Sequence, residues 1–189
     1  MTIRHTIFII AAVCASLVSC TGGSRPVPVP RPRAYPRIEL SAPDYSPLTL
    51  GPVSFSVNSA ATVAIDSSRM WLDLTYPPAY GVTLNLTVTP VTRATLPDVL
   101  ANRTERMALN IGSSQAEVLS MRTRTGAAAT LISSPAATLT PLQLLATDSA
   151  TYVLSATISP RSSLPSRTDS VAPVHAALRA DMIRLLQSL

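Results

Sequence analysis

The sequence predicts an α+β domain built on a mainly antiparallel sheet, with one central helix and one C-terminal amphipathic helix. Two observations indicate this class. Short stretches that alternate apolar and small polar residues fill most of the chain after residue 37, as in strands with one solvent-facing side. Two other stretches, 95–112 and 168–189, repeat apolar residues at helical spacing. Adjacent strands with segregated helices are typical of α+β domains.

The first half of the domain is expected to form strands. In VTLNLTV every second residue from Val82 to Val88 is apolar, so these side chains should share one inward face. Asn58-Ser59 has the composition of a short turn between two of the strands. The strands expected in this half are RIELSA (37–42), VSFSV (53–57), ATVAID (61–66), MWLDLTY (70–76) and VTLNLTV (82–88).

The central helix is expected within residues 95–112. Thr95 is the predicted N-cap, Pro97 fits the first turn, and Gly112 is a good terminator. Residues at helical spacing should form its apolar stripe, namely Leu96, Leu100, Met107 and Ile111.

Strands are expected again in the second half of the domain. Two turns are predicted there, one at Thr125-Gly126 and one at Asp148-Ser149, because these residue types favour tight turns. The stretches expected to be strands are EVLSMRT (117–123), AATLIS (128–133), LTPLQLLAT (139–147) and TYVLSATIS (151–159).

The final helix, within residues 168–189, has the clearest periodicity in the chain. Asp169 or Ser170 is expected to cap it, and Pro173 is tolerated in a first turn. Arg179, Asp181 and Arg184 are expected off the centre of the apolar stripe. The stripe consists of Val171, Val174, Leu178, Met182, Leu185 and Leu189.

Residues 1–19 are predicted to be a lipoprotein signal peptide. A mostly apolar run of 13 residues, 6–18, is too short to cross a bilayer as a helix, which needs about 20 apolar residues. Its length suits the core of a secretion signal. The sequence LVSC that ends at Cys20 resembles the lipobox of bacterial lipoproteins, in which this cysteine becomes the acylated first residue. An ordinary signal peptide and a membrane-spanning N-terminus are the alternatives.

Residues 20–36 are predicted to be a lipidated tether, followed by a periplasmic domain at 37–189. Prolines recur through this stretch, and each fixes its own φ and favours extended geometry in the residue before it. At about 3.1 Å per residue, the stretch from Pro26 to Pro36 would span roughly 30 Å as a polyproline II helix. A ligand for a proline-binding module is the alternative.

The composition argues against nucleic acid as a partner. All 15 basic residues are arginine, they are scattered along the chain, and the formal net charge is only +5. Nucleic-acid surfaces need clustered cations and often aromatic platforms. No phosphate-binding glycine loop and no set of metal ligands is evident, so no cofactor is expected.

Catalytic arrangements are also weakly supported. After the predicted signal, His175 is the only histidine, and it fits a partly exposed position on the last helix better than a catalytic base. Asp66 and Asp73 would have to converge across a hairpin to form a glycosidase-like pair. Trp71 is interpreted as a core or sheet-face anchor, with a ligand platform as the less favoured alternative. The protein is therefore predicted not to be an enzyme.

Several segments in fixed order resemble the gliding-motility-associated lipoprotein family GldD. They are PRPRAYPRIEL, MWLDLTYP, LNLTVTPV, PLQLLATDSATYVLSATIS and DSVAPVHAALRADMIRLLQSL, which together span nearly all of the predicted mature chain. The strand YVLSATIS is less aromatic than the family pattern leads us to expect. The positions that match most clearly, interpreted as structural or interaction positions, are Trp71, Tyr76, Pro77, Thr147, Asp148, Ser149, Asp169, Ser170 and Pro173.

The resemblance implies a non-enzymatic outer-membrane lipoprotein, facing the periplasm, that assists assembly or stability of the gliding motility and type IX secretion machinery. Its implied partners are the membrane, through the lipid on Cys20, and other gliding or secretion lipoproteins. The order of elements also resembles PsbP/Mog1-like domains, which is an analogy of fold alone. A small-ligand-binding envelope domain and an unrecognised hydrolase are the alternative functions; the hydrolase would require a buried pair of His175 with an aspartate.

Overall fold

The computed structural model describes residues 42–111, 115–134, 140–161 and 172–189. The predicted signal peptide, Cys20 and the tether lie outside the described residues, as do Gly112, Val171 and the caps Asp169 and Ser170. No helix in the described part of the chain is long and apolar enough to cross a membrane.

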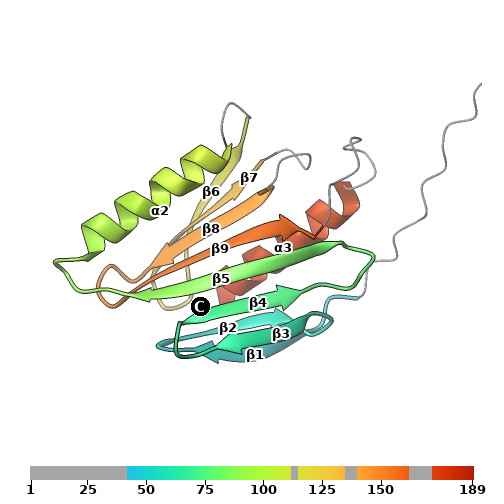
Figure 1. Cartoon of the computed structure of the whole chain (residues 1–189), viewed down its shortest axis with the longest axis horizontal. Coiled ribbons are helices and arrows are strands. Elements are labelled where there is room, and N and C mark those ends of the chain that lie inside the picture. Colours follow the sequence, from blue (N-terminus) through green and yellow to red (C-terminus); the bar gives the residue numbers. More distant parts are fainter. Residues whose placement is uncertain (1–41, 112–114, 135–139, 162–171) are drawn as a thin grey trace, which may run out of the picture. The chain divides into compact units, whose positions relative to one another are not determined.

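A seven-stranded antiparallel sheet forms the centre of the fold, and two helices and a two-stranded sheet accompany it (Figure 1). This arrangement confirms the predicted α+β class. The order across the large sheet is β3-β4-β5-β9-β8-β7-β6. Its strands are β3 (Thr62–Asp66), β4 (Trp71–Thr75), β5 (Val82–Pro90), β6 (Glu117–Arg122), β7 (Ala128–Ser133), β8 (Leu142–Thr147) and β9 (Tyr152–Pro160).

Helix α3 (Ala172–Ser188) packs on one face of this sheet, against β7 and β8, and also against strand β2 of the small sheet. Side chains from these elements form one hydrophobic core, in which Leu84, Leu144 and Met182 are fully buried. The predicted stripe of the last helix is confirmed where it is described, because its members are buried. They are Val174, Leu178, Met182, Leu185 and Leu189.

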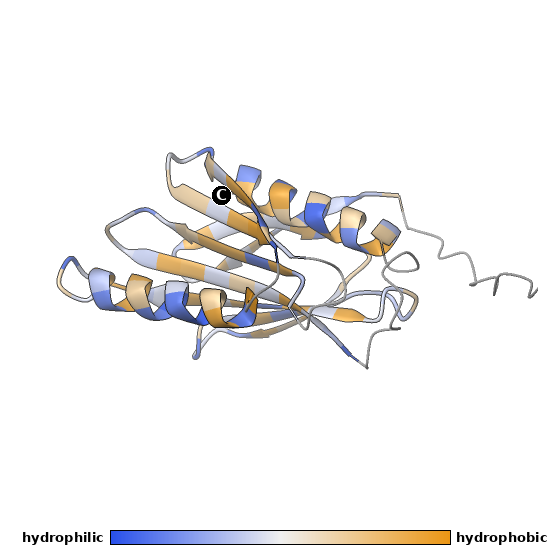
Figure 2. Ribbon diagram, turned by 90° about the horizontal axis from the view of Figure 1, so that it is seen from above, coloured by the Kyte–Doolittle hydropathy of each residue, from blue (hydrophilic) through white to orange (hydrophobic). Residues whose placement is uncertain are grey.

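Helix α2 (Leu96–Ile111) lies on the other face of the large sheet, so the two helices flank it (Figure 2). The Thr95 carbonyl accepts the first helical hydrogen bond, from Val99 N, which confirms the predicted start. The Thr95 hydroxyl instead bonds to Thr92 in the preceding turn. Of the predicted apolar stripe only Met107 is buried, so α2 covers its face of the sheet more loosely than α3 does.

The alternation predicted for β5 is confirmed. Val82, Leu84, Leu86 and Val88 are all buried in the core, and the Thr and Asn residues between them lie on the opposite face. The register continues this division across the sheet, since Leu86 lies beside Leu72 of β4 and Ala156 of β9. The sheet therefore has one apolar face under α3. Its other face is polar along β4 and β5, but Ile132 of β7 and Leu145 of β8 make it apolar beneath part of α2.

The structure corrects two details of the expected strand order. Strand β1 (Tyr45–Leu50) is not among the predicted strands, and all but one residue of the stretch predicted as the first strand, 37–42, lies outside the described residues. Strand β1 pairs with β2 (Val53–Asn58), and Pro47 is tolerated because this sheet has only two strands, both of them edges. The chain leaves the small sheet after Asn58, so β3 pairs with β4 and not with β2.

Candidate functional site

The polar face of the large sheet is lined by small hydrogen-bonding side chains from three adjacent strands. Asn85 of β5 lies between Asp73 of β4 and Thr157 of β9 in register. The Asn85 amide nitrogen donates to Asp73 Oδ1 at 2.8 Å, and Ser159 Oγ donates to Asn85 Oδ1 at 3.1 Å. These bonds hold Asn85 in one orientation on a face that is otherwise rich in hydroxyl groups.

A pocket of about 230 Å³ lies where α2 meets this polar face. The helix contributes Arg103, Arg106 and Met107 to its lining. The sheet and the helix together contribute six neutral polar side chains, namely Asn85, Thr87, Asn110, Gln143, Ser155 and Thr157. We call Arg103, Arg106 and these six residues the arginine pocket.

Gln143 fixes the helix to the floor of the arginine pocket. It is fully buried, and its amide oxygen accepts a hydrogen bond from Asn110 Nδ2 at 3.1 Å. Its amide nitrogen donates to the Met107 carbonyl at 3.4 Å. A buried amide with both groups bonded holds one arrangement, because an unpaired polar group in this position is costly.

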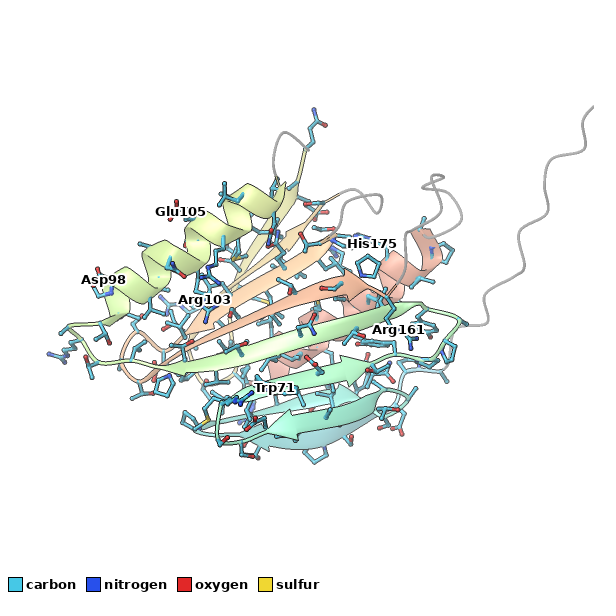
Figure 3. The ribbon with its side chains drawn as sticks, in the orientation of Figure 1. Trp71, Asp98, Arg103, Glu105, Arg161 and His175 are labelled. Atoms are coloured by element: carbon cyan, nitrogen blue, oxygen red, sulfur yellow. The ribbon has the colours of Figure 1, made fainter. Side chains whose placement is uncertain are left out.

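The two arginines of the pocket have no carboxylate within 4 Å among the described residues, whose ion pairs are Asp66–Arg69 and Glu117–Arg179. Arg103 Nη2 donates to Thr89 Oγ1 at 3.1 Å. Partial burial, and secondly the charge of Arg106, lower the pKa of Arg103. Figure 3 shows Arg103 between α2 and the strands, whereas Glu105 points away from the sheet.

The hydroxyl groups of Thr87, Ser155 and Thr157 complete the lining, and none of them has a hydrogen-bond partner among the described residues. Asn85 and Thr157 face each other across β5 and β9 in the sheet register. The arginine pocket thus presents two positive groups above several free hydroxyls, which suits the binding of a small polar anion.

A second polar group is buried on the apolar side of the sheet. Asp181 of α3, only 8% exposed, accepts hydrogen bonds from Tyr45 Oη at 2.7 Å and Asn58 Nδ2 at 2.9 Å. Tyr76 lies close enough to be affected by the same carboxylate: burial first, and then the charge of Asp181, raise the pKa of Tyr76. We call Tyr45, Asn58, Tyr76 and Asp181 the Asp181 cluster.

The Asp181 cluster joins the small sheet, the large sheet and α3. Burial, and then the hydrogen bond to Asp181, raise the pKa of Tyr45 to about 12. The guanidinium of Arg184 lies 5.7 Å from the centre of the Tyr45 ring. Asp181, expected off the centre of the apolar stripe, is nevertheless buried, because Tyr45 and Asn58 supply the hydrogen-bond donors that its burial requires.

The family-matching aromatic positions lie around β4. Trp71 is half-buried at the start of β4, on the polar face opposite Thr87 of β5. Tyr76 follows the strand, and its ring is stacked on that of Tyr80 with 5.8 Å between centroids. The Pro77 carbonyl accepts a hydrogen bond from Tyr80 N. This bond closes the turn that brings the rings of Tyr76 and Tyr80 together.

Thr147, Asp148 and Ser149 form the turn between β8 and β9, where a turn was predicted. Ser149 has a positive φ of 64°, and Thr147 Oγ1 donates to the Tyr152 carbonyl at 2.7 Å. Burial would raise the pKa of Asp148, but hydrogen bonds from Thr151 and from backbone N–H groups outweigh it and lower this pKa to about 2. Pro173 is exposed in the first turn of α3.

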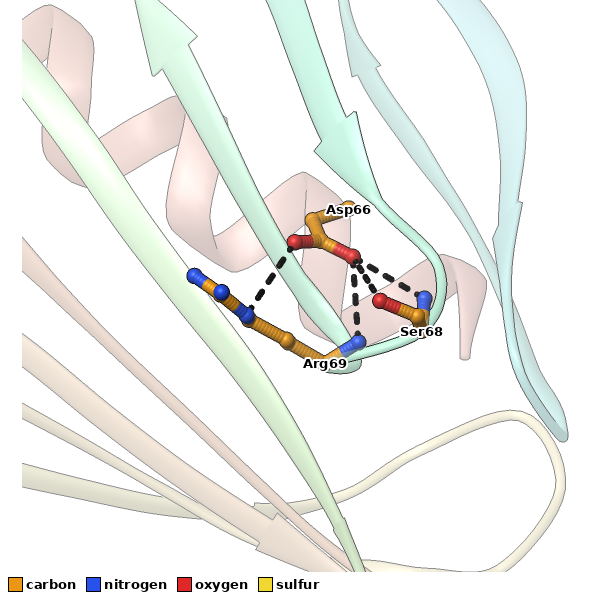
Figure 4. A network of polar contacts seen from close by, with 3 residues as sticks. All are labelled: Asp66, Ser68 and Arg69. Carbon is orange, nitrogen blue, oxygen red and sulfur yellow. Dashed lines mark hydrogen bonds and ion pairs between the residues drawn. The ribbon is translucent and has the colours of Figure 1, made fainter.

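Asp66 and Asp73 are held by different partners. Asp66 ends β3 and accepts hydrogen bonds from Ser68 N, Ser68 Oγ and Arg69 N in the following turn (Figure 4). Arg69 Nε also lies 3.5 Å from its second oxygen. Asp73 bonds instead to Asn85 on the polar face.

His175 is half-buried on α3, and its Nε2 atom has no hydrogen-bond partner among the described residues. The buried Asp181 bonds to Tyr45 and Asn58, not to this histidine. Within the described ranges, no group of three metal-ligating side chains is brought together.

Sequence reasoning missed the arginine pocket. The arginines were judged scattered, although Arg103 and Arg106 are three residues apart and share one face of a helix. That spacing was visible in the sequence. The hydroxyl groups below them come from separate strands, so their convergence required the sheet register.

An α+β domain with an accessible polar face, preceded by a lipobox-like cysteine, is the organisation of an envelope lipoprotein. Comparison with protein families agrees: the family described as gliding motility lipoprotein GldD matches residues 25–189. The chain belongs to this family. No curated protein and no solved structure matches it, so the resemblance to PsbP/Mog1-like domains stays a prediction.

Proposed function

We propose that this protein is a non-enzymatic assembly or stability factor of the gliding motility and type IX secretion machinery. The observation that carries the proposal is the family match, which covers 25–189 and so includes the whole folded domain. Its mechanism is binding. A lipid on Cys20 confines the domain to a layer beside the membrane and raises its effective concentration near partners anchored in the same membrane.

The polar side chains of the described domain support a binding role. Asp66, Asp148 and Asp181 each accept several hydrogen bonds that hold a turn or join elements. A general base needs a free lone pair within reach of a substrate proton. These carboxylates instead use their oxygens to stabilise the fold.

We place the lipid anchor in the outer membrane, with the domain facing the periplasm. Residues 21–23, directly after Cys20, contain no acidic side chain, and an acid at this position alters lipoprotein sorting in many envelopes. A polyproline II tether would hold the domain away from the bilayer by roughly 30 Å, which is long enough to clear the headgroup layer.

The test is crosslinking in the protein's own cells, followed by affinity purification of the tagged full-length lipoprotein. We expect other gliding or secretion lipoproteins to be recovered from the wild type and lost in Cys20→Ala. Cys14→Ala is the matched control, because it removes the other cysteine and leaves the lipobox intact. Recovery of the same partners from both variants would show that the lipid is not needed for assembly. Recovery of no envelope protein from the wild type would overturn the assembly role.

A further inference from the structure

We propose that the arginine pocket binds a small hydroxylated anion, namely a sugar that carries a carboxylate or phosphate group. The two guanidinium groups of Arg103 and Arg106 would hold the anionic group. The hydroxyl and amide groups of Asn85, Thr87, Ser155 and Thr157 would hold the hydroxyls of the ring. This inference goes beyond the assembly role and does not depend on it.

The charge arrangement is the first argument. Arg103 and Arg106 lie one turn apart over the same pocket with no carboxylate within 4 Å among the described residues, so each destabilises the other. An anion bound between the two arginines would offset the repulsion between their charges. Planar guanidinium groups bind carboxylate and phosphate in paired hydrogen bonds, which makes these the anions that fit best.

The floor of the pocket is the second argument. Thr87, Ser155 and Thr157 present hydroxyl groups that have no partner among the described residues. Asn85 is held in place by Asp73 and Ser159, and its position is fixed before any ligand binds. A floor of preorganised donors and acceptors matches a ring that carries several hydroxyl groups.

The size of the pocket limits the ligand. At about 230 Å³ it is smaller than the roughly 300–1,000 Å³ that is typical of sites for drug-sized molecules. A single sugar ring with one anionic group is of the right scale. Trp71 of β4 is the register partner of Thr87, which lines the pocket, so further units of a glycan or of a glycolipid headgroup would extend from the ring towards β4.

The test is isothermal titration calorimetry on the mature lipoprotein in neutral detergent. The probes are glucuronate, glucose 1-phosphate, inorganic phosphate and glucose. We expect both anionic sugars to bind and glucose not to bind. Loss of charge-assisted hydrogen bonds in the double variant Arg103→Gln/Arg106→Gln should weaken the anionic sugars about ten-fold to hundred-fold. Arg93→Gln is the matched control, because Arg93 is exposed in the turn before α2 and does not line the pocket.

A second variant separates the recognition of hydroxyls from the capture of charge. Thr157→Val keeps the shape of the side chain but removes the hydroxyl, so it should weaken both anionic sugars several-fold and leave inorganic phosphate unchanged. Lipid A dispersed in the same detergent tests the membrane source. Binding of lipid A without the soluble sugars, abolished in the double variant, would assign the sugar phosphate to a glycolipid headgroup.

Two results would overturn the proposal. One is the absence of heat for every anionic probe, lipid A included, up to about 10 mM, which is weaker than any useful affinity. The other is binding with equal affinity by the double variant. Because these titrations use isolated protein and the assembly role is tested by crosslinking in cells, the two hypotheses can fail separately.

Discussion

The two polar groups on opposite faces of the large sheet differ in how their charges are balanced. In the Asp181 cluster, a buried carboxylate accepts hydrogen bonds from Tyr45 and Asn58 and so is satisfied by the protein itself. In the arginine pocket, two guanidinium groups stand over a hollow without a carboxylate within 4 Å among the described residues. The first arrangement is typical of stabilisation and the second of binding.

Burial and polarity together therefore do not identify a functional site. Both groups contain charged residues on helices and neutral partners on strands. What separates them is whether the protein completes its own hydrogen bonds, because a completed network has no remaining capacity for a ligand. If this is so, substitutions in the Asp181 cluster should change the free energy of unfolding more than substitutions in the arginine pocket.

The largest effect is expected for Asp181→Ala. The change leaves Tyr45 and Asn58 without their acceptor at the junction of the small sheet and α3, which should cost about 3 kcal/mol of the free energy of unfolding. Urea denaturation of the mature protein measures this. Glu105→Ala is the control, because Glu105 is exposed on α2, and its change should stay within about 0.5 kcal/mol. Equal effects of the two variants on the free energy of unfolding would show that the Asp181 cluster does not stabilise the fold.

Tyr45→Phe should have the next largest effect. It removes one hydrogen bond to a carboxylate, worth about 1.5 kcal/mol, and keeps the ring that Arg184 contacts. A double-mutant cycle with Asp181→Ala measures whether the two residues act together. Since Tyr45 acts through Asp181, its loss should cost little once Asp181 is gone. Simple addition of the two effects would contradict the proposed coupling.

Asp148 is intermediate between the Asp181 cluster and the arginine pocket. Its carboxylate is solvent-exposed, yet it accepts hydrogen bonds from backbone N–H groups. Its pKa in the folded protein, about 2, is below the ordinary value of 3.8. The stability it supplies is therefore present above about pH 4 and is lost as the pH falls through 2. After allowance for solvent screening it is about 1 kcal/mol.

Thermal unfolding between pH 7 and pH 2 tests this contribution. The wild type should lose it progressively over the acid part of that range, and Asp148→Asn should already lack it at pH 7. Comparison of the two proteins cancels the acid sensitivity of all other groups. Parallel pH profiles at every pH would show that Asp148 has no depressed pKa.

The smallest effect is expected for Arg103→Gln/Arg106→Gln. Removal of two like charges that no carboxylate balances should change the free energy of unfolding by less than about 0.5 kcal/mol, even though Arg103 loses its bond to Thr89. At low ionic strength, added salt should slightly raise the free energy of unfolding of the wild type but not of the double variant, because salt screens the repulsion between Arg103 and Arg106. Strong destabilisation would mean that the arginine pocket is structural.

Much of the fold followed from the sequence because its strongest patterns are local. Alternation in 82–88 and the stripe of the last helix each lie within one element, and burial of one face is enough to fix them. Strand β1 could not be found in this way. Pro47 interrupts its pattern, and its pairing with β2 makes it a strand.

The α+β class, most of the strands, the two helices and membership of the lipoprotein family could be predicted from the sequence, because each depends on periodicity or on residues in a fixed linear order. The predicted lipobox at Cys20 belongs to the same kind of information, since a processing enzyme recognises it as a linear peptide. None of these features needs a distant part of the chain.

Which polar residues contact one another depends on how distant elements pack. Tyr45, Asn58 and Asp181 are up to 136 positions apart, and they come together because the small sheet packs on α3. Arg103 and Thr157 share a pocket only because β9 lies between β5 and β8 in the sheet. Whether a charge is balanced or left available depends on such distant partners, and a local pattern carries no information about them.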